Sequence, residues 1–236
     1  MTTINVNTIE SSTSTLTIGE SGNSVVATDS VNVNLIKDAS GATMWQSNGS
    51  GVLSNVNSAF GDSIVLVDST TCSNTASVTY TLTSTYKEYI FECITINPVT
   101  DDVKVQFQVS NNGTDYNKTI TSTFWVAYNT ESGSPTGLTY DGLHDQAQGT
   151  AFKTIFKEVG NDADQACSIK LHLINPSSTT YAKNFYARGT GTLHHQYIQD
   201  QFTAGYINDT AAMTSIRFQM SSGNINAGKI KMYGVK

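Results

Sequence analysis

The chain has 236 residues, of which 14% are charged and 38% are hydrophobic, and its formal net charge is −6 at pH 7. The acidic balance and the lack of a dense Lys/Arg cluster argue against a nucleic-acid interface. No run approaches the roughly 18 apolar residues of a membrane span, and residues 1–10 lack the basic and apolar regions of a secretory signal. We therefore expect synthesis in a cytoplasm, with no membrane insertion.

The first 62 residues contain short β-type runs separated by Gly, Ser, Asn and Asp turn signals. Each run is too short to bury a core, so it needs neighbours, and identical chains are the simplest source of them. We interpret residues 1–62 as an extended arm or shaft of short strands; a flexible polar tail is the alternative. Residues 45–51 are expected to form a turn-rich junction. The runs are Ile4–Val6, Thr15–Ile18, Val25–Ala27 and Val31–Ile36.

From residue 63 the alternation of apolar and polar residues becomes regular. In Val103–Val109 the apolar residues should point inward, and Lys104, Gln106 and Gln108 outward. Asn112-Gly113 predicts a hairpin to a returning strand at Thr119–Tyr128, followed by a long loop over residues 129–150. The other expected strands are Ser63–Val67, Ala76–Leu82, Glu88–Ile96, Ala151–Val159, Ala166–Ile174, Tyr181–Arg188, Gly191–Tyr197, Thr214–Met220 and Lys229–Val235.

This density of strands, with turn signals between them and no long helical pattern, predicts an all-β chain. Residues 63–236 are expected to form an antiparallel β-sandwich of jelly-roll type. The three cysteines, Cys72, Cys93 and Cys167, are too widely spaced for a CxxC motif. We expect no disulfide, and we expect Cys93 and Cys167 to be small buried hydrophobic residues.

Several residue groups resemble catalytic or metal-binding motifs without matching them. Asp141, His144 and Asp145 fit no zinc spacing, and the acidic turns at 101–102, 115 and 161–164 fit no EF-hand loop. Gly223–Lys229 matches GxxxxGK, but it leads into an expected strand rather than a helix, so we interpret it as a hairpin turn. Adjacent residues His194 and His195 on a strand would point to opposite faces. We predict no catalytic residue, no metal site and no cofactor.

Aromatic side chains near loops and strand ends are the candidate binding residues. Flat apolar rings suit the C–H faces of pyranose sugars, whereas the alternative is that these rings fill the core and subunit interfaces. Tyr181 and Tyr186 also lie near loops and strand ends, and with the four candidates below they form a wider group of aromatic residues. The glycan-binding candidates are Trp125, Tyr128, Tyr140 and Tyr197.

Segments along nearly the whole chain resemble structural proteins of marine and cyanobacterial bacteriophages. The similar segments are Met1–Glu10 with Leu16–Gly22, Tyr86–Asp101, Gln108–Thr114 and Ser215–Lys236. The last is the most specific, since it resembles a closing hairpin of two strands joined through Ser-Gly-Asn. The resemblance implies a virion structural protein, made in the host cytoplasm, that tends to be trimeric; it brings no catalytic residues with it.

These observations lead to one main expectation and two alternatives. The main one is a tail fibre or tail-associated protein: residues 1–62 attach to other virion proteins or intertwine with identical chains in a trimer, and the sandwich binds host surface polysaccharide. Several weak sites on one particle would then give avidity. One alternative is a capsid decoration protein, a cement or head-fibre protein that stabilises the shell. The other is a carbohydrate-active enzyme, which the lack of a facing acid pair disfavours.

Overall fold

The computed structural model of the protein describes residues 35–37, 40–47, 50, 53–56, 63–193, 195 and 197–236. Over these ranges the chain forms β-strands and no helix, which confirms the all-β prediction, and it contains no helix that could cross a membrane. It divides into two compact units, Met1–Gly61 and Asp62–Lys236. The expected runs Ile4–Val6, Thr15–Ile18 and Val25–Ala27, and residue His194, lie outside the described residues.

The first unit contains a small antiparallel sheet in the order β1-β2-β3. Its strands are β1 (Leu35–Lys37), β2 (Thr43–Ser47) and β3 (Leu53–Val56). Trp45 pairs with Ile36 on one side and with Val56 on the other. The interpretation of residues 45–51 as a turn-rich junction is therefore wrong at its start, because Trp45 lies in the central strand.

The second unit consists of two antiparallel sheets. Its strands are β4 (Ile64–Thr75), β5 (Ser77–Thr81), β6 (Glu88–Pro98), β7 (Val103–Ser110), β8 (Ile120–Ser122), β9 (Trp125–Thr130), β10 (Thr136–Tyr140), β11 (Gln146–Gly149), β12 (Lys153–Val159), β13 (Cys167–Ile174), β14 (Lys183–Thr192), β15 (Tyr197–Ile207), β16 (Ser215–Met220) and β17 (Ile225–Val235).

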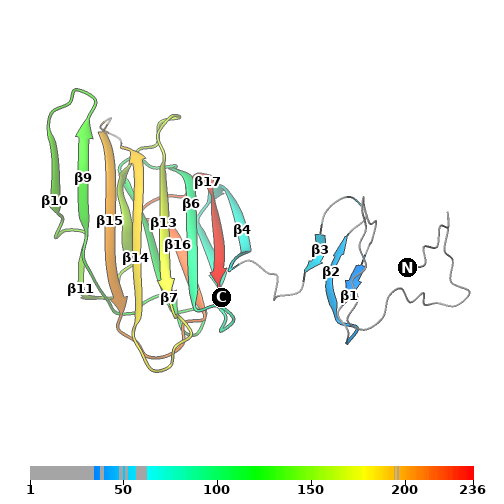
Figure 1. Ribbon diagram of the computed structural model, residues 1–236. Coiled ribbons are helices and arrows are strands. Elements are labelled where there is room, and N and C mark those ends of the chain that lie inside the picture. The colour runs from blue at the N-terminus through cyan, green and yellow to red at the C-terminus, as the bar shows by residue number, and fades with distance from the viewer. Residues whose placement is uncertain are drawn as a thin grey trace, which may run out of the picture. The chain divides into compact units, whose positions relative to one another are not determined.

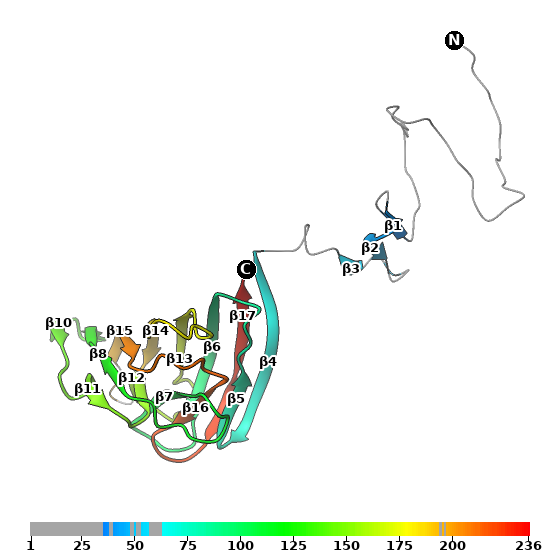
Figure 2. The ribbon, with the colours of Figure 1, turned by 90° about the horizontal axis from the view of Figure 1, so that it is seen from below.

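The strand order within the two sheets is that of a jelly roll. Strands β4-β17-β6-β13 lie side by side in the larger sheet, and β5-β16-β7-β12 form the smaller one. Taken in chain order, these eight strands alternate between the two sheets, except that β7 and β12 both belong to the smaller one. This order gives the two Greek keys of a jelly roll. Strands β14, β15, β9 and β10, with the short β8 and β11, extend the larger sheet to ten strands (Figure 1). Figure 2 shows the smaller sheet on one side of the larger one.

Aromatic rings from both sheets meet in the core. Phe91 of β6 lies 5.2 Å from Phe218 of β16, and Phe107 of β7 lies 5.1 Å from Phe185 of β14, as centroid distances. All four are essentially inaccessible to solvent. Burial of each contributes about 2–3 kcal/mol before entropy, and the tilted and edge-to-face contacts add to this. The alternation that predicted these strands therefore produces one continuous core. Cys72, Cys93 and Cys167 are free and buried in it.

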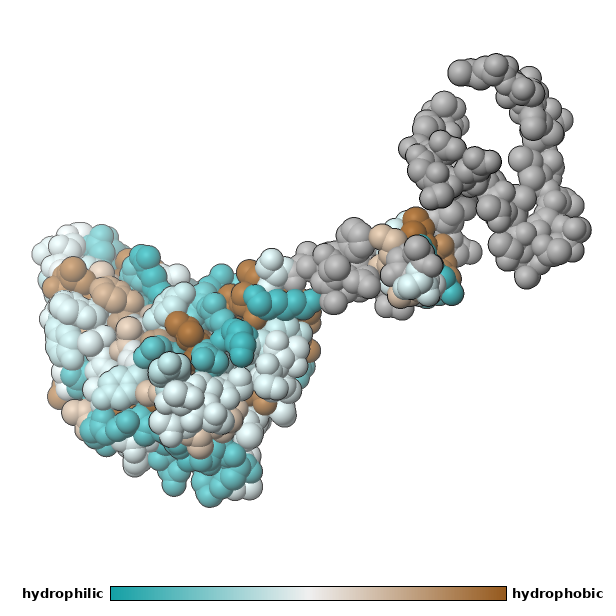
Figure 3. Space-filling view, turned by 60° about the horizontal axis from the view of Figure 1, so that its bottom comes forward, coloured by the Kyte–Doolittle hydropathy of each residue, from teal (hydrophilic) through white to brown (hydrophobic). Residues whose placement is uncertain are grey.

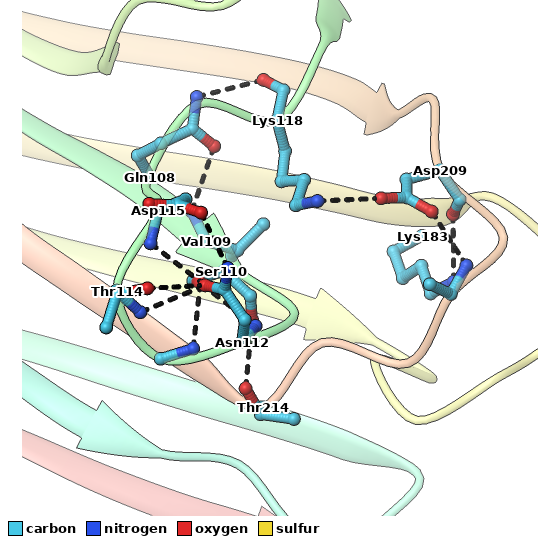
Figure 4. A network of polar contacts seen from close by, with 12 residues as sticks. Gln108, Val109, Ser110, Asn112, Thr114, Asp115, Lys118, Lys183, Asp209 and Thr214 are labelled. Carbon is cyan, nitrogen blue, oxygen red and sulfur yellow. Dashed lines mark hydrogen bonds and ion pairs between the residues drawn. The ribbon is translucent and has the colours of Figure 1, made fainter.

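Strand β7 corrects two predictions. Val103, Val105, Phe107 and Val109 point inward as expected, but Gln108, predicted to face outward, is fully buried. Its amide nitrogen donates to the carbonyls of Lys118, Thr150 and Ala151. Its oxygen accepts from the Val109 N–H, and Figure 4 shows this bond and the one to Lys118. These bonds satisfy the buried amide. The Asn112-Gly113 hairpin is also absent. Strand β7 pairs with β12 and β16, whereas β8, the strand directly after the turn, pairs with β11 and β15.

Three further segments differ from their predictions. The long loop expected at 129–150 contains β10 and β11. The expected strand Gly191–Tyr197 is instead the end of β14 and a turn at residue 195, and the following strand, β15, was not predicted. The closing hairpin is absent, because β16 belongs to the smaller sheet and β17 to the larger. Residues 225–229, expected in a hairpin turn, belong to β17.

Candidate functional site

The outer face of the larger sheet, which points away from the core, gathers side chains from six strands. Along these strands, residues of this face alternate with buried ones, as in the pattern of β14. Inter-strand register places one residue from each strand in a single row across the sheet. That row is Tyr140, Trp125, Phe202, Arg188, Lys170 and Glu92. Its aromatic residues are at one end and its charged residues are at the other.

At the aromatic end, Trp125 has a ring on each side. Its ring lies edge-on to Tyr140 at 5.1 Å, and it is within 6° of parallel to Phe202 at 6.2 Å. Trp125 is 36% exposed and Tyr140 is 43% exposed, so both rings reach solvent. Figure 3 shows hydrophobic residues at the surface of the end of the domain that carries β9 and β10 in Figure 1.

Next to Trp125 the surface is hollowed. An open depression of ≈ 600 Å³, here called the aromatic hollow, is lined by Thr123, Trp125, Tyr186, Phe202 and Ala204 among others. The hollow exists because Ala204 pairs with Tyr186 across β14 and β15, so a small side chain stands between large rings. Such a wall of exposed rings can bind a flat, partly apolar ligand.

Neighbouring side chains fix the orientation of the Tyr186 ring. The His172 ring stacks on it at 4.3 Å with an angle of 10° between the planes. His172 Nδ1 lies 2.5 Å from a carboxylate oxygen of Glu88, which fixes the imidazole in turn. The ring of Tyr186 remains 46% exposed. This side chain is therefore pre-oriented, so binding a ligand costs it little rotamer entropy.

A second depression adjoins the first. This depression, of ≈ 710 Å³, is here called the polar hollow after its charged side chains. It is lined by Glu92, Lys170 and Asp200, by Ser168 and Thr190, and also by apolar residues such as Ile94; Arg188 lines both hollows. Arg188 forms a bidentate ion pair with Asp200, and Lys170 pairs with Glu92 at 2.9 Å. The hydrogen bond from Lys170 lowers the pKa of Glu92, against the effect of its partial burial. Both carboxylates therefore already have cationic partners.

The four predicted glycan-binding residues are divided between the two faces of the sheet. Trp125 and Tyr140 lie together on the outer face. Tyr128 alternates with Trp125 and lies on the opposite face, where its ring covers Gly137. Tyr197 is partly buried against the core and its ring lies 6.2 Å from His195. Of the wider group, Tyr186 belongs to the site, whereas Tyr181 lies in the loop before β14.

The groups considered as metal sites are engaged in other contacts. Asp141 binds both His144 and Lys157 at 2.9 Å, while Asp145 accepts from the Tyr140 hydroxyl. In the turn after β7, Asn112 Oδ1 accepts from the backbone of Thr114 and Asp115, and the Asn112 amide donates to Asp115 (Figure 4). Across the described residues, no group of three or more His, Cys, Asp or Glu side chains is arranged for a metal ion.

Sequence reasoning missed Arg188, Phe202, Lys170 and Asp200. Phe202 and Asp200 lie on β15, the strand that was not predicted, and only the register of β14 with β15 brings Arg188 next to them. The sequence pattern that could have revealed Arg188 is the alternation along β14. It places Tyr186, Arg188 and Thr190 on one face of the strand, so that an aromatic and a cationic residue lie side by side.

No family model, curated protein or solved structure matches this chain in the comparisons made with them.

Proposed function

We propose that the protein is a bacteriophage virion structural protein, a tail fibre or tail-associated protein, whose jelly-roll domain binds glycans on the host surface through the aromatic hollow. The observation that carries this proposal is the exposed set of rings formed by Trp125, Tyr140 and Tyr186, which belongs to a rigid sheet and serves no core packing. A fold alone does not specify a function, so the site is the stronger support.

The proposal includes assembly as a homotrimer, which the sequence resemblance implies, and attachment to the particle through residues 1–62, whose short strand-like runs need neighbouring chains. Three copies, each with one weak glycan site, would bind a cell surface by avidity. Pyranose rings stack on aromatic side chains through their C–H faces, and each stacking contact is individually modest, which matches an open hollow rather than a deep pocket.

The charged residues of the site support binding without catalysis. Glycoside hydrolysis needs one carboxylic acid with a raised pKa opposite a second carboxylate. In the polar hollow the pKa of Glu92 is lowered, and Asp200 is held by the Arg188 guanidinium. We therefore propose that the protein is not an enzyme. Release of reducing sugar from a bound polysaccharide would contradict this part of the proposal.

A matched pair of variants tests the glycan site. Trp125→Ala removes the central ring of the outer face, whereas Tyr128→Ala removes a ring of the same strand from the opposite face. Full-length protein is applied to an array of bacterial surface polysaccharides, and dissociation constants are then measured for the bound glycans. We expect Trp125→Ala to weaken binding about five- to thirtyfold and Tyr128→Ala to change it less than about twofold, since stacking on one ring is worth about 1–2 kcal/mol. Equal effects, or no bound glycan, would overturn the glycan-binding role.

The position on the particle needs a separate measurement. Electron microscopy of virions labelled with an antibody against the protein should place it on the tail, in a few tens of copies or fewer. Labelling spread over the head in hundreds of copies would instead establish a capsid decoration protein. Incorporation of a variant that lacks residues 1–62 would refute attachment through that segment.

A further inference from the structure

Positive charge is concentrated around the polar hollow of an otherwise acidic protein. Lys170 and Arg188 line the hollow, and Lys229 and Lys231 lie beside it on β17, next to Ile94 and Glu92 of β6. These four cations face two carboxylates, Glu92 and Asp200, whereas the whole chain has a net charge of −6. The local field at this surface therefore attracts anions.

Arg188 is positioned to bind an anion. Its Nε donates to both oxygens of Asp200 at 2.9 and 3.1 Å, and its Nη2 lies 2.5 Å from Oδ2. The side chain is 74% exposed. Within the described ranges no residue accepts a hydrogen bond from Nη1, so two N–H donors of an oriented guanidinium point to solvent. A fixed guanidinium suits a planar carboxylate better than a flexible ammonium group does.

The other polar side chains of the polar hollow suit a polyhydroxylated ligand. Ser168 and Thr190 are small and exposed, and they leave the space that makes the hollow. The oxygens of Glu92 and Asp200 can accept hydrogen bonds from sugar hydroxyls, while Lys170 and Arg188 can donate to them. Because Arg188 lines both hollows, a chain of two or more sugars could stack on Trp125 or Tyr186 and reach the cations.

We propose that the preferred ligand is an acidic glycan, in which a uronate carboxylate binds Arg188 in the polar hollow while a neighbouring sugar stacks in the aromatic hollow. This inference rests on the proposed glycan-binding function and specifies its ligand class.

The test compares two forms of the same sugar chain. The probes are oligogalacturonate of six to eight residues and its fully methyl-esterified form, which has the same backbone without the carboxylates. Binding to full-length protein is measured by isothermal titration calorimetry at low salt. The variants are Arg188→Gln and, as a control with the same charge change on the smaller sheet, Lys104→Gln. Trp125→Ala reports on the aromatic hollow.

We expect the native protein to prefer the free acid over the ester by at least about tenfold. Arg188→Gln should remove most of that preference, because it weakens binding of the free acid far more than binding of the ester. Lys104→Gln should retain the preference, and Trp125→Ala should weaken both probes. If both probes bind equally and only Trp125→Ala matters, the acidic-ligand inference fails while glycan binding stands. If neither probe binds and the polysaccharide array is also negative, both proposals fail together.

Discussion

Arg188 and Asp200 are twelve positions apart in the chain yet form a bidentate ion pair across β14 and β15, with Nη2 2.5 Å from Oδ2. The pair is exposed, so it adds little to the stability of the fold. The ion pair instead orients Arg188, so that its guanidinium lies between the aromatic hollow and the polar hollow. The charge of Arg188 and the stacking surface of Trp125 should therefore be separable in experiments.

Salt concentration should separate these two contributions. The Debye length falls from about 10 Å at 0.1 M salt to about 3 Å at 1 M, which screens an exposed cation but does not weaken ring stacking. We predict that Arg188→Gln raises the dissociation constant for oligogalacturonate by a factor that is at least about threefold smaller at 1 M NaCl than at 0.05 M. The loss caused by Trp125→Ala should persist. Titration of both variants across this range provides the check, and parallel salt dependence would contradict the assignment.

Lys153 is a fully buried lysine on β12. Its ammonium nitrogen donates to the His144 carbonyl at 2.6 Å and lies 4.9 Å from the centroid of the Phe124 ring. Burial lowers its pKa to about 7, against the opposing charges of Asp145 and Asp141. Between pH 7 and its ordinary pKa of 10.5, the unfolded chain binds the proton and the folded chain does not. The free energy of unfolding should therefore rise with pH, by at most about 1.4 kcal/mol per unit from this group.

Lys153→Met should reduce that pH dependence. Urea denaturation at pH 7.0, 7.5, 8.0 and 8.5 gives the slope for each protein, in a range below the ordinary thiol pKa of the cysteines. The variant should also be as stable as the native protein or more so at pH 7, because an apolar side chain replaces a buried amine. Lys183, whose pKa burial also lowers, leaves a smaller slope of the same sign in both proteins. Identical slopes would show that Lys153 does not titrate in this range.

Asp141 forms a network with Lys157 and His144, each at 2.9 Å. Burial raises the pKa of Asp141, but hydrogen bonds from Lys157, His144 and the Leu143 N–H outweigh it and lower the pKa to about 2. The stabilisation is complete above the ordinary value of 3.8 and is lost as pH falls toward 2. We predict that Asp141→Asn lowers the free energy of unfolding by about 1–2 kcal/mol at pH 7. The difference should shrink as pH falls below 3.8 and disappear only below about pH 2 in denaturation curves; a constant difference would contradict this.

Gly234 on β17 lies directly against the ring of Tyr86, which contacts Tyr89 edge-on at 5.5 Å. A Cβ at this position would overlap the Tyr86 ring. We predict that Gly234→Ala lowers stability by about 1–3 kcal/mol through overpacking. Gly142→Ala is the control, because the nearest atom to its new Cβ is 3.9 Å away. Thermal unfolding of both variants tests this, and an unchanged melting temperature for Gly234→Ala would refute it.

The sequence was informative where strand alternation was simple. Along β5 and β7 the apolar residues Val78, Tyr80, Val105 and Phe107 are buried as predicted, because each strand has one face on the core. These strands were enough to predict a jelly-roll sandwich. Their pairing was less predictable, because the Asn112-Gly113 turn connects two sheets rather than two neighbours in one sheet.

The candidate site was harder to predict because β15 has polar residues on its buried face. Gln199, Gln201 and Thr203 point inward, and the Gln201 amide donates to the Lys157 carbonyl and to Gln199. Phe202 is on the outer face, so the usual pattern of apolar residues inside and polar residues outside is reversed. Tertiary contacts with Lys157 and Glu158 of β12 provide further partners for the two glutamine amides. A single sequence does not show such partners, so half of the outer-face site was missed.

The pairing of β4 with β17 has a mechanical consequence. Val235 pairs with Ile64, and the Lys236 N–H donates to the Ser63 carbonyl, so residues 63 and 236 lie together at one end of an antiparallel pair. A pulling force applied between these two positions would act across the hydrogen bonds and open them one after another. A force that enters at residue 63 and leaves through β14, β15 or β9, which carry the aromatic hollow, must also cross this pair, because β4 is the edge strand of the larger sheet and pairs there with β17.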